Sequence, residues 1–215
     1  MQVIVTAGPT YEPLDQVRRL TNFSTGQLGC ELAVFLAQQG GTVTLLLGEQ
    51  AVYPPPSGIP VERFSSGADL RSRLQARAGE GVAAVFHAAA VGDFGFGSVF
   101  QRDAHGTLTK IKSGKFSTRA GTLLVELVPT PKIISELRGW FPNAFLAGWK
   151  YEVDGGRESV LAQAAEQMRQ NQTSACVCNG PAYGKGFGLL AANASLRHFD
   201  ARPELFAALL QSIAS

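Results

Sequence analysis

The chain has 215 residues, 45% of them hydrophobic, a length that suits one domain burying about 70% of the surface its unfolded form would expose. Its 19 basic and 17 acidic residues include no Lys or Arg block typical of a nucleic-acid surface or membrane anchor, and no apolar run reaches the roughly 20 residues of a membrane span. With no cleavage signal before the first strand, we predict a single cytoplasmic domain over residues 1–215 that binds neither nucleic acid nor membrane. The three cysteines, Cys30, Cys176 and Cys178, make no even disulfide framework and are interpreted as small core residues.

Short apolar runs alternate with helical patterns along the chain. Strands are predicted at residues 3–6, 42–47, 61–64, 82–87, 144–148 and 174–178. Helices are predicted at residues 28–36, after residue 67, around 133–140, from 160 to 168 and at 205–213. This alternation predicts an α/β fold, specifically a Rossmann-like, doubly wound, mostly parallel sheet.

A long polar loop, residues 6–26, separates the first strand from the first helix. Ser24 and Thr25 are predicted to cap that helix, whose free N–H groups and positive dipole end attract phosphate or carboxylate. Capping alone would account for these two residues. The loop also carries Arg18, a fork-shaped cation, and Asn22, an amide that can donate to a carboxylate. The combination predicts an anion-binding site.

The fourth predicted strand ends in the small residues 88–92, followed by Asp93. Small side chains let a ligand approach the backbone, and the carboxyl ends of parallel strands are where ligands bind in open α/β sheets. Asp93 is therefore placed to meet a ribose, a base or a metal-bound phosphate, although a turn-forming aspartate explains it equally well. His87 lies within an apolar strand and is interpreted as structural rather than catalytic.

Residues 94–126 break the pattern, because Gly, Lys, Ser and Thr dominate and only residues 123–126 resemble a strand. A loop of this length inside a compact domain is usually functional. We predict either a mobile flap over the ligand or a dimerisation element. Lys110, Lys112 and Lys115 could close over a polyphosphate as mobile point charges, with a solvated basic loop as the alternative.

The signatures of three enzyme classes are absent from this sequence. No Gly-x-Gly-x-x-Gly follows the first strand, and no tyrosine lies four residues before a lysine. A nicotinamide-dependent oxidoreductase therefore has only fold analogy in its favour. Walker-type phosphate loops and the Gly-x-Ser-x-Gly elbow of hydrolases are also absent.

Four motifs, in sequence order, resemble phosphopantothenoylcysteine synthetase, also called phosphopantothenate–cysteine ligase. They are TNFSTG at 21–26, AAAVGD at 88–93, KIK at 110–112 and VPTPK at 128–132, and the resemblance runs from residue 2 to about residue 180. It implies a ligase of coenzyme A biosynthesis, in which CTP or ATP with Mg2+ activates the carboxylate of 4'-phosphopantothenate as an acyl-nucleotidyl anhydride. Cysteine then displaces the nucleotide. A stand-alone synthetase and a homodimer are expected.

The resemblance also implies roles for individual residues. The expected catalytic residues are Asn22, which stabilises the acyl intermediate, and Lys110, which stabilises charge on the α-phosphate. The expected substrate-binding residues are Arg18, Ser24, Thr25, Gly26 and Ala90. The expected nucleotide-binding residues are Gly8, His87, Ala88, Ala89, Asp93, Lys110, Pro131, Lys132, Ile133, Ile134, Trp149 and Lys150. Metal ligands stay open.

The sequence departs from the family pattern on one predicted helix. Glu166 and Gln170 stand where the bacterial fused enzymes place nucleotide-binding lysines, and Lys150 is a candidate replacement cation. Residues 143–152 look closer to eukaryotic members, which favour ATP, so nucleotide choice stays open. Loss of the lysines favours a non-catalytic nucleotide-binding homologue. Retention of three other residues favours the ligase: Asn22, Asp93 and Lys110.

Overall fold

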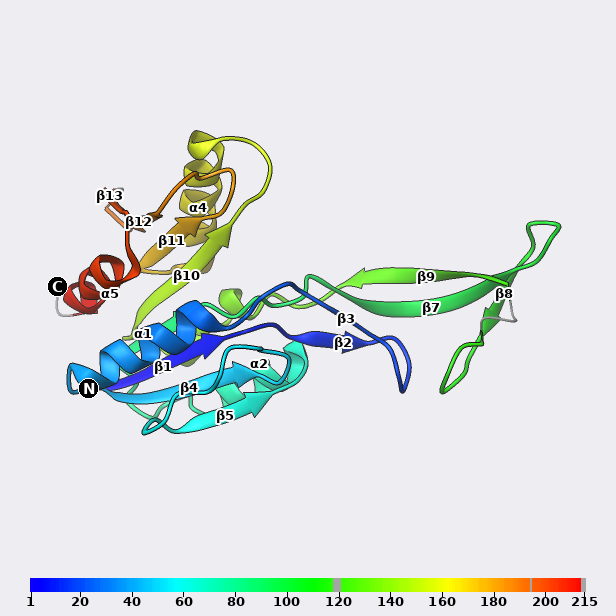
Figure 1. Ribbon diagram of the computed structural model, residues 1–215, viewed down its shortest axis with the longest axis horizontal. Coiled ribbons are helices and arrows are strands. Elements are labelled where there is room, and N and C mark those ends of the chain that lie inside the picture. Colours follow the sequence, from blue (N-terminus) through cyan, green and yellow to red (C-terminus); the bar gives the residue numbers. More distant parts are fainter. Residues whose placement is uncertain (118–120, 194, 214–215) are drawn as a thin grey trace.

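The computed structural model describes residues 1–117, 121–193 and 195–213, and consists of a body with a long arm projecting from it (Figure 1). The strands of the body's main sheet are β1 (Gln2–Ala7), β4 (Thr42–Gly48), β5 (Val61–Phe64), β6 (Ala84–His87), β10 (Phe145–Tyr151), β11 (Ala175–Asn179), β12 (Phe187–Ala191) and β13 (Leu196–Phe199). The helices are α1 (Gln27–Gln38), α2 (Gly67–Gln75), the short 3-10 helix η2 (Ile133–Ser135), α3 (Leu137–Trp140), α4 (Arg157–Asn171) and α5 (Arg202–Ile213).

The main sheet has the strand order β13-β12-β11-β10-β6-β1-β4-β5. The six strands from β5 to β11 are parallel, and β12 and β13 add an antiparallel edge. Counted along the chain, the parallel strands follow the 3-2-1-4-5-6 order of a Rossmann fold, and the winding direction reverses between β1 and β6. The predicted fold class is confirmed.

Helices cover both faces of this sheet because its strands are apolar on both sides. On one face α1 and α5 pack together, with the rings of Phe35 and Phe206 5.9 Å apart. On the other face α2, α3 and α4 cover the alternate side chains of the same strands. All three cysteines are buried, as predicted. Within the described residues, no helix is long and apolar enough to cross a membrane.

The start of α1 differs from the prediction that Ser24 and Thr25 cap it. Gly26 is the N-cap residue, in a left-handed conformation with φ of 81°, and it has no side chain with which to cap the helix. Only glycine enters this conformation without strain. Thr25 Oγ1 still accepts the N–H of Gln27 at 3.2 Å, so it supports the first turn from outside.

The polar loop before α1 also contains a short hairpin, β2 (Tyr11–Pro13) and β3 (Arg19–Thr21), that the sequence patterns did not indicate. The predicted helix around 133–140 is instead divided between η2 and the four-residue α3. The hairpin extends from the body on the side from which the arm leaves (Figure 1).

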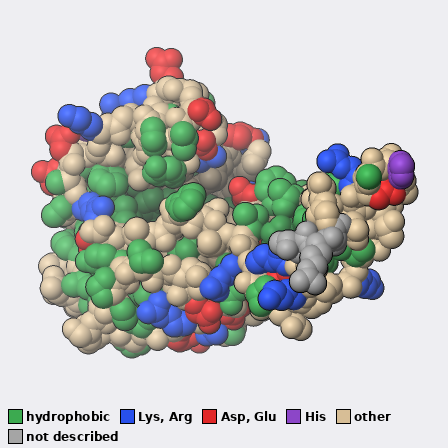
Figure 2. Space-filling view, turned by 45° about the vertical axis from the view of Figure 1, so that its right-hand side comes forward, with side chains coloured by type: hydrophobic (Ala, Val, Ile, Leu, Met, Phe, Trp, Pro, Cys, Tyr) green, Lys and Arg blue, Asp and Glu red, His purple; other side chains and the backbone are tan. Residues whose placement is uncertain are grey.

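The arm is a three-stranded antiparallel sheet in the order β8-β7-β9, made of β7 (Phe94–Arg102), β8 (Leu108–Ile111) and β9 (Thr122–Pro129). The expectation of an irregular segment with a strand only at 123–126 was wrong. Gly95 and Gly97 weaken the strand pattern of β7, yet β7 pairs with a strand on each side, with a register shift between Phe96 and Val99. In Figure 2 the arm stands off the body, with Lys and Arg side chains gathered where the two meet.

Candidate functional site

A cavity of about 740 Å³ opens at the carboxyl edge of the main sheet, where the winding of the strands reverses. This is where open α/β sheets bind ligands. Its lining includes twelve of the residues predicted for the site: Gly8, Asn22, Ser24, Thr25, Gly26, Ala88, Ala89, Ala90, Asp93, Lys132, Trp149 and Lys150. The sequence thus predicted much of one connected surface, although its members come from four separate segments.

Asn22 joins the loop before α1 to the loop after β6. Its side-chain Nδ2 donates to the carbonyl oxygens of Ala90 and Val91, both at 3.2 Å. The two loops are also linked through the backbone, since Ala90 N–H donates to Gly8 O at 2.9 Å. The amide nitrogen of Asn22 is therefore occupied, and these long bonds must give way before it can donate to a carboxylate.

Small residues let the first turn of α1 sit close to β1 at the cavity wall. A Cβ on Gly29 would lie 2.5 Å from the Cβ of Ala7, which leaves no room for a side chain. Gly8 has φ of 79°, and a Cβ there would lie 2.8 Å from the Cβ of Ala51. Because this close approach fixes α1, its first-turn N–H groups end beside the cavity, where an anion is favoured.

Three cations line the cavity, and each is paired with a carboxylate. Lys132 pairs with Asp93, Lys150 with Glu152 at 2.9 Å, and Arg202 with Glu31 at 2.8 Å. The pairs come from different parts of the fold, and the arm's lysines are not among them. An anionic ligand therefore enters a cavity whose positive charges are already compensated and must exchange partners with them.

Two buried polar atoms beside the cavity lack a hydrogen-bond partner among the described residues: Trp149 Nε1, a donor, and Asn179 Oδ1, an acceptor. Trp149 lies on β10 and Asn179 at the end of β11, two positions apart in the register of neighbouring strands and on the same face. Buried polar groups are normally paired, so a ligand with complementary groups fits here. Asn179 was not predicted, though its place at the carboxyl end of a buried strand is a signal related to the one that marked Asp93.

The sequence matches, over residues 1–204, the family described as the DNA/pantothenate metabolism flavoprotein C-terminal domain, abbreviated DFP. The chain belongs to this family. It is 33% identical over 183 residues to the coenzyme A biosynthesis bifunctional protein CoaBC of Thermococcus kodakarensis, and 30% identical over 193 residues to CoaBC of Mycolicibacterium smegmatis. These matches cover 83% and 87% of the chain but 41% and 44% of the relatives, so this DFP domain spans less than half the length of those proteins.

Solved structures share the fold of this DFP domain. The DNA/pantothenate metabolism flavoprotein from Streptococcus pneumoniae matches with a TM-score of 0.86 at 25% identity, over 100% of this chain and 98% of that chain. A Cab2 variant in complex with phosphopantothenate-cysteine matches with a TM-score of 0.70 at 20% identity, over 99% of this chain and 87% of that chain. At that lower identity the second likeness concerns the fold alone.

His87 lies beneath the cavity of the DFP domain rather than on its surface. It is 7% exposed, and its Nδ1 is 3.0 Å from Thr6 Oγ1, which also accepts the N–H of Ala89 at 3.1 Å. Burial lowers the pKa of His87 to about 4, so the ring is neutral at physiological pH. This agrees with its structural interpretation and leaves it a supporting residue under Ala88 and Ala89.

Five other predicted residues also lie outside the cavity lining: Arg18, Lys110, Pro131, Ile133 and Ile134. Ile133 is 2% exposed and belongs to the core cluster under α2 and α3. Ile134 approaches Gly148 from below, 2.8 Å from where a Cβ would stand. Lys110 lies on β8 of the arm, opposite Phe100. Ile133 and Ile134 thus support the cavity wall from beneath, whereas Lys132 of the same segment lines it.

Arg18 clamps the tip of the β2–β3 hairpin to the loop that follows β8. Its guanidinium donates to Asp15 Oδ2 at 2.6 Å and to the carbonyl oxygen of Phe116 at 2.6 Å. The Asp15 carboxylate, enclosed by its partners, also accepts N–H groups of Val17, Arg18 and Phe116. Burial alone raises the pKa of Asp15, but these N–H groups and the guanidinium outweigh it and lower the pKa to about 2.

Asp15→Asn is expected to change the acid stability of the chain. Because the pKa of Asp15 is lower folded than its ordinary 3.8, its stabilisation is complete above pH 4 and is lost as the pH falls towards 2. The variant should lack this part of the acid transition and melt at a lower temperature at pH 7. Circular dichroism melts between pH 7 and 2 measure both, with Asp154→Asn, at an exposed position, as the matched control. Equal melting curves for wild type and Asp15→Asn would show that the contacts of Asp15 with Arg18 and Phe116 do not stabilise the fold.

Glu166 and Gln170, the two α4 residues that depart from the family pattern, do not line the cavity. Glu166 is bound by Arg169 at 2.6 Å and by Gln170 at 2.6 Å on the exposed side of the helix. Gln167, one residue further and about 100° around the helix, lines the cavity instead and approaches Gly148 and Cys176. Gln167 is therefore the α4 residue whose chemistry bears on a ligand.

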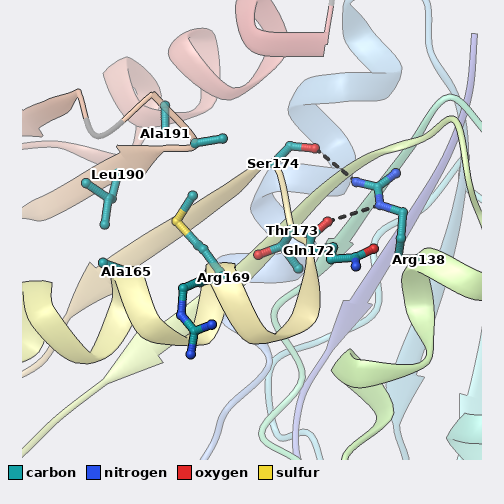
Figure 3. A pocket seen from close by; sticks show the side chains of 10 residues that line it. Arg138, Ala165, Arg169, Gln172, Thr173, Ser174, Leu190 and Ala191 are labelled. Atoms are coloured by element: carbon teal, nitrogen blue, oxygen red, sulfur yellow. Dashed lines mark hydrogen bonds between the residues drawn. The ribbon is translucent and has the colours of Figure 1, made fainter.

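A second cavity, of about 530 Å³, lies at the opposite edge of the sheet, between the end of α4 and β12 (Figure 3). Its wall is largely apolar, with Ala165, Met168 and Leu190 among its residues. Arg138 at its side donates to the carbonyl oxygen of Gln172 at 3.0 Å and to other carbonyl groups, so it closes the end of α4. None of the predicted site residues lies here.

Proposed function

We propose that this DFP domain is a cytoplasmic ligase that condenses 4'-phosphopantothenate with cysteine in coenzyme A biosynthesis, using CTP or ATP. The observation that carries the proposal is the cavity in which Asn22, the first turn of α1 and residues 88–93 meet. Two further observations support it. Relatives that match this chain are named for coenzyme A biosynthesis, and the Cab2 complex holds phosphopantothenate-cysteine, which is the product of such a condensation.

The proposed reaction has two steps. The carboxylate of phosphopantothenate attacks the α-phosphorus of the nucleotide, so that an acyl-nucleotidyl anhydride forms and pyrophosphate leaves. The amine of cysteine then attacks the acyl carbon, and the nucleoside monophosphate leaves. Both steps depend on positioning and on compensation of charge at oxygen atoms.

The residues of the cavity suit these needs. Ser24, Thr25 and Gly26 lie at the start of α1, where anionic phosphate is favoured. Asn22 lies against Ala90, where we propose that its side chain contacts the acyl intermediate. The unpaired donor of Trp149 and the unpaired acceptor of Asn179 offer groups to the nucleotide, as do the cations of Lys132 and Lys150.

Mg2+ is expected to accompany the nucleotide. Among the described residues no group of three or more His, Cys, Asp or Glu is arranged to hold a metal ion. The cavity lining does include two separate carboxylates, Asp93 and Glu152. This donor set fits an ion held mainly by phosphate oxygens with one carboxylate, as Mg2+ often is. When bound, Mg2+ neutralises phosphate charge.

The test is pyrophosphate release by the purified protein with 4'-phosphopantothenate, cysteine and Mg2+, with CTP and ATP supplied in separate reactions. We expect release that requires phosphopantothenate and one of the two nucleotides. Such release would support the ligase and identify the nucleotide. No release with either would favour a non-catalytic nucleotide-binding homologue.

The arm is proposed to build a homodimer. Apolar side chains of the arm are exposed, among them Leu108 (51%), Leu127 (52%) and Val128 (42%), and β8 and β9 are edge strands of the arm's sheet. Exposed apolar surface of this kind marks an interface. A second copy of the chain is the occupant that would also bring Lys110, which lies away from its own cavity, to the cavity of a partner.

We predict that Asn22→Asp and Lys110→Ala, each with strongly reduced turnover alone, regain about a quarter of the wild-type rate when co-expressed, because random pairing makes about half of the dimers mixed. In a mixed dimer that exchanges arms, one cavity receives both defects and the other receives none. Light scattering reports the mass, and pyrophosphate release reports the activity. A monomer, or a dimer without recovery, would contradict this arrangement.

A further inference from the structure

Arg202, the first residue of α5, brings a cation from near the end of the chain to the cavity. Its Nη1 donates to Oε2 of Glu31 at 2.8 Å, and the other oxygen of Glu31 accepts from Nε2 of Gln27 at 2.7 Å. Gln27 is the first residue of α1. This row of three side chains holds Arg202 beside the end of α1 that faces the cavity.

The guanidinium of Arg202 has donors to spare. In the described part of the chain, its Nε and Nη2 have no hydrogen-bond partner, and its side chain is 36% exposed. Burial raises the pKa of Glu31, but the hydrogen bonds from Arg202 and Gln27 outweigh it and hold the pKa below its usual range. Glu31 is therefore charged at neutral pH and compensates Arg202 until an anion arrives.

The other two cations of the cavity are lysines, which act as point charges, whereas an arginine presents a planar fork that matches phosphate oxygens. The first turn of α1 carries no acidic side chain that would repel an anion. We infer that Arg202 binds the phosphate tail of the nucleotide at the start of α1, exchanging its bond to Glu31 for phosphate oxygens. The identity of the ligand as a nucleotide rests on the proposed function.

The experiment is calorimetric titration of the full chain with inorganic tripolyphosphate, which has the charge of the tail without the base. Arg202→Gln is expected to bind it about 10-fold more weakly, the usual loss of one charge-assisted contact. Arg197→Gln is the matched control, because this substitution removes the same charge outside the cavity. Arg197 lies on β13 over the ring of Phe199. It should bind within about twofold of wild type.

Arg202→Lys keeps the charge but loses the fork, and is expected to bind about threefold more weakly. It decides the question if Arg202→Gln fails to fold. Wild-type affinity in Arg202→Gln, or in Arg202→Lys when only that variant folds, would overturn the inference. Absence of tripolyphosphate binding by wild type would overturn it too.

The titration requires no turnover, so it separates this inference from the ligase proposal. Arg202-dependent binding by a protein that releases no pyrophosphate would support the phosphate contact and refute the ligase. Pyrophosphate release together with unchanged binding by Arg202→Gln would do the reverse.

Discussion

Asn22→Asp is expected to lower the turnover number for pyrophosphate release by about 100-fold, as loss of one preorganised donor does in other acyl-transfer sites. In the wild type the amide nitrogen faces the carbonyl oxygens of Ala90 and Val91, both at 3.2 Å. A carboxylate there turns oxygen towards oxygen and places a negative charge where the substrate's own carboxylate must bind. The measurement is steady-state pyrophosphate release with saturating substrates.

The fold should tolerate this change because Asn22 is exposed. We expect the melting temperature of Asn22→Asp to stay within about 3 °C of wild type, since surface substitutions usually change stability little. Asn143→Asp, which adds the same charge at another exposed position outside the cavity, is the control and should retain full turnover. Equal turnover in Asn22→Asp and Asn143→Asp would remove Asn22 from the mechanism.

His87 is expected to make the domain less stable as the pH falls from about 7 to 4. Its pKa is lowered from 6.5 to about 4 by burial, so the unfolded chain takes up a proton before the folded chain does. The stabilisation is complete above pH 6.5 and is lost as the pH falls to 4. Between pH 7 and pH 4 the protonation of His87 should therefore lower the free energy of unfolding by about 3 kcal/mol.

Urea unfolding at pH 7, 6, 5 and 4.5 tests this expectation. His87→Gln keeps a side chain that can bond Thr6 but does not titrate, so its unfolding free energy should vary less over this range. His105→Gln, at an exposed turn of the arm, should keep the wild-type pH dependence. A wild-type slope in His87→Gln would show that His87 is not the titrating group.

The sequence by itself determined that strands and helices alternate in the body, and it indicated the loops that carry the site. Period-two and helical spacing are local properties, so the strands near β1, β4, β5, β6, β10 and β11 could be predicted to within a few residues. Once the sheet was predicted to be parallel, the segments after β1 and β6 had to meet at its carboxyl edge. Asn22 and Asp93 were predicted separately from these two segments, Ala90 was implied by the family resemblance, and all three line one cavity.

Tertiary structure decided what depends on contacts between distant residues. The glycine-bearing strand β7 is stable as a strand because it pairs with β8 and β9, and Asp15 is enclosed by an arginine three residues away and a backbone 101 residues away. Helical rotation placed Gln167 rather than Glu166 at the cavity. Arg202 reached the same cavity because α5 packs beside α1, and no local pattern in the sequence carries the energy of that packing.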